Sequence, residues 1–200
     1  MLKVGLTGGL ACGKSFVGEA LAGMGCLLIQ ADELGHEVLA PNGEAYEGVI
    51  NEFGREILAG DGTIDRRALA ARVFGDPDRL ARLNALVHPA VIRREEARIA
   101  EFAAREPNGI AVVEAAILIE TGSYKRFDKM ILVTCDPERQ VERAMHRGAS
   151  ESDARARLSR QMPTAEKRKF ADFVIDTSGE KQDTLRQTRD VFEQLRRIQP

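Results

Sequence analysis

The residues best suited to chemistry form one short stretch, Gly8-Gly9-Leu10-Ala11-Cys12-Gly13-Lys14-Ser15, which follows the pattern G-x-x-x-x-G-K-[ST]. Its glycines let backbone N–H groups curl around anionic oxygens, and Lys14 brings a positive charge to the β- and γ-phosphates. The hydroxyl of Ser15 can ligand Mg²⁺. The stretch therefore predicts a phosphate loop, whose nucleotide contacts are expected at Gly9, Leu10, Ala11, Cys12, Gly13, Lys14, Ser15 and Phe16.

The flanking residues supply the elements that such a loop needs. Residues 2–7 form a short apolar run typical of a strand, and residues 16–24 carry apolar side chains at helical spacing. Strand, loop and helix follow one another in the required order, and the helix would point the positive end of its dipole at the phosphates. This context favours a phosphate loop over the alternative, a glycine-rich turn that matches the pattern by chance.

Two carboxylates follow apolar runs further along the chain. Asp32 comes just after the run 26–29, which we expect to lie beside the strand of the phosphate loop, with Asp32 facing the ligand crevice. A helix N-cap is the alternative role for Asp32. Glu114 ends the run 110–113 and resembles the acid of a Walker B strand, which acts on Mg²⁺ through water.

The rest of the chain alternates between helical and strand patterns. Residues 41–106 contain no strand-like run and predict a helical insertion, with helices over 44–53, 66–74 and 77–105; Pro89 should kink or break the last one at His88. Strands are expected at 130–133 and 173–176, helices at 33–39, 138–147, 150–161, 164–170 and 182–197. The pattern predicts a three-layer α/β fold with a five-stranded, mainly parallel sheet.

The helices between residues 137 and 169 are rich in arginine and lysine. Acidic residues are interleaved with them, so a solvated surface with i,i+4 ion pairs accounts for most of these side chains. In a phosphoryl-transfer enzyme, a basic helical hairpin can also supply an arginine that neutralises transition-state charge. Arg143 and Arg147 lie four residues apart, on one helical face, and are the preferred pair.

Composition narrows the class of protein. The 200 residues are 44% hydrophobic and 30% charged with a net charge of −2, which suits one packed domain and gives no sign of nucleic-acid binding. No signal peptide or membrane-length apolar run is present in the sequence, so we expect a cytoplasmic protein. Three well-separated cysteines predict neither disulfides nor a zinc site. Cys12 is interpreted as a small residue that fits the loop; a lowered thiol pKa is the alternative.

Over nearly its whole length the chain resembles the dephospho-coenzyme A kinases, a family of P-loop kinases. The resemblance rests on the order and spacing of short motifs: Gly5-Leu6-Thr7-Gly8-Gly9-Leu10, Gly13-Lys14-Ser15, Ala31-Asp32, His36, Asp61-Gly62, Arg66, Leu83-Asn84, His88-Pro89, Glu114-Ala115-Ala116, Glu120, Arg143, Arg147, Arg157, Gln161, Ala171-Asp172 and Ile175-Asp176.

The resemblance implies transfer of the ATP γ-phosphoryl group to the ribose 3′-hydroxyl of dephospho-coenzyme A, the last step of coenzyme A biosynthesis. It implies Asp32 as general base, with His36, Asn84 and His88 also on the acceptor, and an ATP adenine near the turn from Asp176 to Gly179. It implies ATP and Mg²⁺ as cofactors, no nucleic-acid or membrane partner, and a monomer or weak homo-oligomer. One P-loop kinase domain would comprise a core (1–35, 107–136 and 170–200), an acceptor-binding insertion (36–106) and a lid (137–169).

Three positions depart from the family pattern. Gln30 replaces the first acid of Asp-Ala-Asp, Phe16 replaces a hydroxyl residue after the loop, and Ile117-Leu118-Ile119 replaces Pro-Leu-Leu-Phe. Two alternatives remain, namely another P-loop kinase of a nucleotide or small molecule, and a regulatory ATP-binding protein without phosphotransfer. The motifs within the insertion disfavour the first, and Asp32 with the basic hairpin disfavours the second.

Overall fold

The fold was analysed in a computed structural model that describes residues 1–198. Its centre is a five-stranded sheet in the order β2-β3-β1-β4-β5. The strands are β1 (Leu2–Gly8), β2 (Leu27–Gln30), β3 (Ile110–Glu114), β4 (Lys129–Thr134) and β5 (Phe173–Asp176). β1 pairs in parallel with β3 and β4, and β4 pairs in parallel with β5. The predicted α/β fold with its five strands is confirmed.

One expected neighbour relation is wrong. β2, which precedes Asp32, does not lie beside β1, because β3 occupies the position between them. The strand beside the phosphate-loop strand is thus the one that ends in Glu114, with Leu6 opposite Glu114 in the register. The crossover after β1 carries β2 past the position beside β1, and the chain fills that position with β3 after the long connection of residues 31–109.

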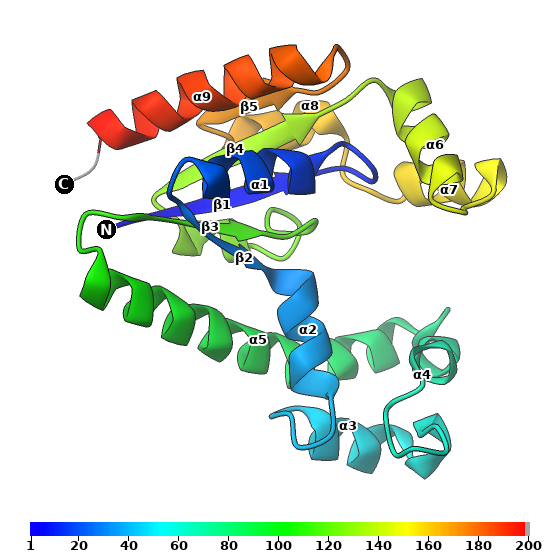
Figure 1. The fold of residues 1–200 in the computed structure, drawn as a ribbon. Helices are drawn as coiled ribbons and strands as arrows, with labels where there is room; N and C mark the ends of the chain where they lie inside the picture. The colour runs from blue at the N-terminus through cyan, green and yellow to red at the C-terminus, as the bar shows by residue number, and fades with distance from the viewer. Residues whose placement is uncertain (199–200) are drawn as a thin grey trace. The chain divides into compact units, whose positions relative to one another are not determined.

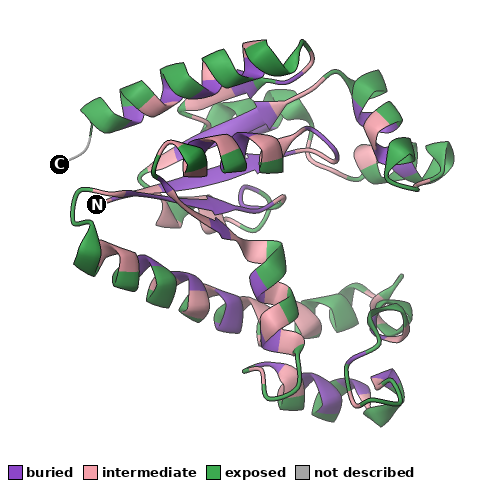
Figure 2. Cartoon of the chain, in the orientation of Figure 1, coloured by how far each residue is buried: buried purple, intermediate pink, exposed green. Residues whose placement is uncertain are grey.

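The chain divides into two compact units, residues 1–29 with 101–200, and residues 30–100. In the first unit, α1 (Lys14–Gly23) and α9 (Lys181–Arg197) pack together on one face of the sheet (Figure 1). Their apolar sides bury Val17, Leu21, Val191 and Leu195 against β1, β3 and β4. Figure 2 shows the strands largely buried and the outer side of α9 exposed. Burial of Ala111, Val113 and Leu132, which alternate with the residues of that core, shows that the opposite face is covered too.

Three further helices of the first unit come from the basic segment: α6 (Pro137–His146), α7 (Glu151–Ser159) and the short α8 (Thr164–Lys167). Asp136 caps α6 through the Glu138 N–H and Ser150 caps α7 through the Asp153 N–H, as short oxygen side chains commonly do. Pro137 occupies the first turn of α6, where no backbone donor is lost. The pair α6 and α7 pack against each other.

The second unit is helical. It contains α2 (Ala31–Leu39), α3 (Tyr46–Phe53), α4 (Arg66–Val73) and most of α5 (Pro77–Arg105). Of the kink or break expected at Pro89, the break is absent, because α5 continues through that residue as one helix. Arg94 and Arg98 of α5 donate to Glu37 of α2, and Arg94 also donates to Glu44, so charged pairs join these helices. No helix within residues 1–198 is long and apolar enough to span a membrane.

Candidate active site

The phosphate loop lies between the end of β1 and the start of α1. Ala11 adopts a left-handed backbone conformation with φ of 51°, and Gly13, which precedes α1, has φ of 86°. A non-glycine residue in this region is strained and persists only where the surroundings fix it. Because α1 starts at Lys14, the first N–H groups of the helix lack intrahelical acceptors and are directed towards the loop. The loop thus has the backbone geometry of an anion site.

Lys14 spans the loop. Its Nζ donates to the carbonyl oxygens of Gly8 at 3.1 Å and Gly9 at 3.0 Å. Both acceptors are neutral, and an anionic phosphate oxygen is a stronger partner for an ammonium group because it adds the attraction between opposite charges. The side chain is therefore held where it can transfer to a nucleotide phosphate.

Ser15 and Glu114 form a pair of oxygen ligands next to the loop. Ser15 Oγ donates to Glu114 Oε1 at 2.9 Å, and the Glu114 side chain is 8% exposed. The position of β3 beside β1 accounts for the contact, since it brings the end of β3 next to the start of the loop. A hydroxyl and a carboxylate suit Mg²⁺, which takes few protein ligands and keeps waters and phosphate oxygens for the rest.

Arg143 of α6 lies against the loop. Its Nη1 donates to Thr177 Oγ1 at 3.0 Å, and its Nη2 donates to the Thr177 carbonyl at 2.8 Å. Nη1 is also 3.6 Å from where a Cβ on Gly13 would stand. Arg147, by contrast, follows the last turn of α6, is exposed, and makes no polar side-chain contact with the rest of residues 1–198. Of the preferred pair, the structure places Arg143 at the loop.

Thr177 is a residue of the site that no sequence pattern indicated. It is 4% exposed, and its Oγ1 donates to the Cys12 carbonyl at 2.7 Å while accepting from Arg143. One hydroxyl thereby links the phosphate loop to the arginine. Threonine directly after a strand is too common in proteins to signal such a role by itself.

The turn after β5 is fixed by its own side chains. Asp176 Oδ1 accepts from the backbone N–H and the hydroxyl of Ser178, at 3.0 and 2.6 Å. Gln187 of α9 bonds both backbone groups of Asp176. The Asp176 carboxylate therefore shapes the turn that leads to Gly179, and the turn has a defined geometry next to Thr177.

Cys12 is buried among these groups. Burial raises the pKa of its thiol, although the charges of Lys14 and Lys167 act in the opposite direction. The alternative of a lowered pKa is wrong, because desolvation of the thiolate outweighs the favourable loop environment. Cys12 is a small buried residue of the loop.

Lys167, in the segment of residues 137–169, is a basic residue with a buried side chain. Its side chain is 2% exposed, and its Nζ lies 2.6 Å from Glu120 Oε1. A buried ammonium is stable only beside an opposite charge. Arg155, by contrast, pairs with Glu138 and Glu151 at the surface.

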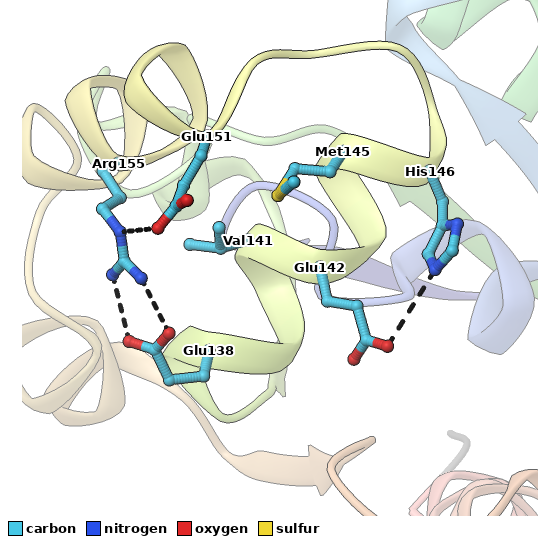
Figure 3. Close-up of a pocket in the computed structure, with 7 residues that line it drawn as sticks. All are labelled: Glu138, Val141, Glu142, Met145, His146, Glu151 and Arg155. Carbon is cyan, nitrogen blue, oxygen red and sulfur yellow. Dashed lines mark hydrogen bonds and ion pairs between the residues drawn. The ribbon is translucent and has the colours of Figure 1, made fainter.

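Figure 3 shows a pocket on the outside of α6 and α7, with Arg155 drawn to Glu138 and Glu151. Its lining is Glu138, Val141, Glu142, Met145, His146, Glu151 and Arg155. Three carboxylates in one pocket disfavour a phosphate, and the arginine is already paired. The phosphate chemistry therefore belongs to the loop and not to this pocket.

The acceptor candidates lie in the second unit. Asp32 is the second residue of α2, is exposed, and makes no side-chain hydrogen bond or ion pair within residues 1–198. The N-cap of that helix is Gln30, so the capping alternative for Asp32 is wrong. His36 is four residues further on and also exposed, which places it on the same helical face.

Asn84 and His88 are likewise four residues apart, on α5, and both are partly buried. Burial lowers the pKa of His88, so its imidazole is neutral at pH 7. Asp61, a motif residue, is occupied locally, because its Oδ1 accepts from the N–H and hydroxyl of Thr63. This carboxylate shapes the turn before Arg66.

A parallel α/β sheet, a phosphate loop with its lysine, an adjacent Ser–Glu pair and an arginine at the loop define a P-loop kinase. The family model for dephospho-CoA kinase matches residues 2–183. This chain belongs to the dephospho-coenzyme A kinase family.

Individual relatives agree with the family model. The chain is 43% identical to a dephospho-CoA kinase of Geobacter metallireducens, covering 94% of this chain and 93% of the relative. It is 39% identical to a dephospho-CoA kinase of Aquifex aeolicus, covering 98% and 99%. The solved structure of a dephospho-CoA kinase from Campylobacter jejuni matches with a TM-score of 0.71 at 28% identity, covering 98% of this chain and 97% of that one.

Proposed function

We propose that this protein transfers the γ-phosphoryl group of ATP to the ribose 3′-hydroxyl of dephospho-coenzyme A, giving coenzyme A and ADP in the last step of coenzyme A biosynthesis. Family membership supports the acceptor. The single observation in the structure that carries the phosphotransfer is Lys14 held across the loop, with the Ser15–Glu114 pair beside it.

ATP binds through the loop from Gly9 to Phe16. The N–H groups at the start of α1 receive the phosphates, and Lys14 leaves its two carbonyl acceptors for a phosphate oxygen. The adenine lies near the turn from Asp176 to Gly179, whose shape is set by the Asp176 carboxylate. Phe16 adds a ring at the first turn of α1, with Lys181 Nζ 5.8 Å from its centroid.

Ser15 would hold Mg²⁺ directly and Glu114 would hold it through a water molecule. When bound, the ion supplies positive charge to the phosphate oxygens. The Ser15–Glu114 hydrogen bond positions both ligands before the ion arrives. The buried carboxylate of Glu114 supplies the negative charge that such a site requires.

Asp32 is the proposed general base, which orients the acceptor hydroxyl and takes its proton. Its exposed carboxylate has no competing partner within residues 1–198, so it is available to a substrate. His36, Asn84 and His88 are proposed acceptor contacts. A neutral His88 can accept or donate one hydrogen bond without adding charge.

Arg143 is proposed to place a positive charge beside the phosphoryl group during its transfer. Its guanidinium is held by Thr177 beside Gly13, from where a change of rotamer would bring it to a phosphate. Arg147 is exposed and uncommitted, and is proposed as a second cation of the hairpin. Phosphoryl transfer depends mainly on such positioning and charge stabilisation.

The test is ADP release by the purified protein with Mg-ATP, with and without dephospho-coenzyme A, together with the mass of the product. Strong stimulation and a product heavier by one phosphate support the proposal. If a folded sample binds ATP but phosphorylates a nucleoside monophosphate or another small molecule instead, the proposed acceptor is wrong. Binding of ATP without turnover on any acceptor would favour a regulatory protein.

A further inference from the structure

Two glutamine side chains bracket a single residue of the phosphate loop. Gln140 Nε2 donates to the Leu10 carbonyl at 2.7 Å, and the Leu10 N–H donates to Gln161 Oε1 at 2.9 Å. Gln140 is on α6 and is 7% exposed, whereas Gln161 comes just after α7. Residues from the two ends of the α6–α7 pair therefore converge on Leu10, and neither is needed by the mechanism above.

An apolar contact accompanies the two amides. Ala11 of the loop is buried with Val141, Ala144 and Ala154 of α6 and α7, and Leu10, Ala149 and Leu158 pack around them. Apolar burial holds the surfaces together but carries little directional information. Hydrogen bonds depend on direction, so the two amides can fix the orientation of the Leu10 backbone where packing alone cannot.

The position of Leu10 makes this orientation consequential. Leu10 directly precedes Ala11 and lies three residues before Gly13, and both of these loop residues have a left-handed backbone conformation. Such conformations persist only where surrounding contacts over-determine them. The Leu10 N–H is used by Gln161 and the Cys12 N–H donates to the Gly9 carbonyl at 3.5 Å, so the contacts around Leu10 set the loop backbone on which the phosphates would bind.

The same amides explain why glycine occupies position 9. The φ of Gly9 lies outside the left-handed region, so its backbone does not call for glycine. A Cβ at this position would lie 2.7 Å from Gln140 Nε2 and 3.3 Å from Gln161 Oε1. Gly9 leaves the space that the amides occupy, so the three residues form one packing unit.

We propose that Gln140 and Gln161 are positioning residues of the phosphate loop. By holding the backbone of Leu10, they set the orientation of the N–H groups that receive the nucleotide phosphates, and they connect the α6–α7 pair to the nucleotide. The link to catalysis rests on the proposed function, whereas the link to nucleotide binding does not require it.

The test uses Gln140→Met, Gln161→Met and their combination, which keep side-chain volume and remove the amides. Gln194→Met is the matched control, because Gln194 is exposed on α9 and bonds only its own helix. Dissociation constants for Mg-ADP by calorimetry, KM for ATP, KM for dephospho-coenzyme A, kcat and thermal midpoints are measured. Each single variant is expected to weaken Mg-ADP binding and raise KM for ATP roughly two- to tenfold, the effect of one hydrogen bond. KM for dephospho-coenzyme A should stay within twofold, a tolerance of about 0.4 kcal/mol.

A second set approaches the same contact from the loop. Gly9→Ala should weaken Mg-ADP binding as the amide variants do, because it displaces the amides. In a Gln140→Ala background, where the closer of the two contacts with the added Cβ is gone, Gly9→Ala should have a smaller effect. This cycle tests the contact even if one of the methionine variants fails to fold.

Mg-ADP affinities of Gln140→Met and Gln161→Met equal to that of the control, with only the thermal midpoint lowered, would overturn the proposal and leave the amides a role in stability alone. If the effects of Gly9→Ala and Gln140→Ala on Mg-ADP affinity simply add in the double variant, the result would also count against the proposal. A wild-type protein that binds Mg-ADP but does not phosphorylate dephospho-coenzyme A would instead refute the proposed function, while the binding comparison still decides the role of the amides.

Discussion

Replacing Thr177 with valine removes one hydroxyl and preserves the shape of the side chain. The lost contacts are the hydrogen bond that Thr177 Oγ1 donates to the Cys12 carbonyl at 2.7 Å, with the Thr134 carbonyl as a second acceptor at 3.2 Å, and the one that it accepts from Arg143 Nη1 at 3.0 Å. Each contributes about 1 kcal/mol net. A hydrogen bond from a charged donor can contribute more than this. The Arg143 guanidinium is only partly buried and keeps its bond to the Thr177 carbonyl, so we use about 1 kcal/mol for its bond as well. Thr177→Val should therefore lower the free energy of unfolding by about 2 kcal/mol.

For a chain of this size, about 2 kcal/mol corresponds to a decrease in Tm of about 4–8 °C. Thr177→Ser is the control, since it keeps the hydroxyl and loses only a methyl group. Because the valine variant also removes one of the two Thr177 contacts that hold Arg143 beside the loop, its kcat should fall roughly tenfold below that of the serine variant, the effect of about 1.4 kcal/mol on the barrier. Urea denaturation and steady-state kinetics measure the two effects. Equal stability and equal kcat in the valine and serine variants would refute the assignment of Thr177 as the link between loop and arginine.

Three further outcomes are expected. Lys14→Ala should lower kcat about a hundredfold or more with dephospho-coenzyme A as acceptor, because it removes a charge from the transition state; a near-normal rate would exclude that role. Because burial lowers the pKa of His88, the unfolded chain takes up its proton first as the pH falls below about 6.5, so stability is lost on acidification. His88→Asn should reduce this loss in denaturation curves measured from pH 7.5 to 5.5, and an unchanged slope would contradict it. Glu120→Gln should destabilise by about 3 kcal/mol because it leaves the buried Lys167 ammonium without its carboxylate, whereas Glu120→Gln with Lys167→Met should recover most of that in the same assay.

The sequence was informative where a local pattern has one structural solution. The phosphate loop is continuous in the chain, and its strand, glycines, lysine and helix need no distant partner to be recognised. The five strands were likewise visible as apolar runs, because strands buried on both faces carry few polar residues. For these elements, composition and order sufficed.

Contacts across the fold could not be predicted in the same way. The place of β3 between β1 and β2 depends on where the chain returns after residues 30–100, and no local residue encodes that choice. Gln140 lies in an amphipathic, charged helix, so nothing distinguished its buried amide from a surface one. α5 continues through Pro89 although proline removes a backbone donor, so a local breaker alone does not locate the end of a helix.

The division of the chain into two units has a consequence for how specificity can change. The polypeptide passes between the units only twice, after Ile29 and within α5 after Ala100. The groups proposed to handle ATP all belong to one unit, and those proposed to contact the acceptor all belong to the other. On this proposal, substitutions within residues 30–100 would change the acceptor contacts and the general base Asp32, while the residues proposed to hold ATP, including both amides on Leu10, would stay unchanged.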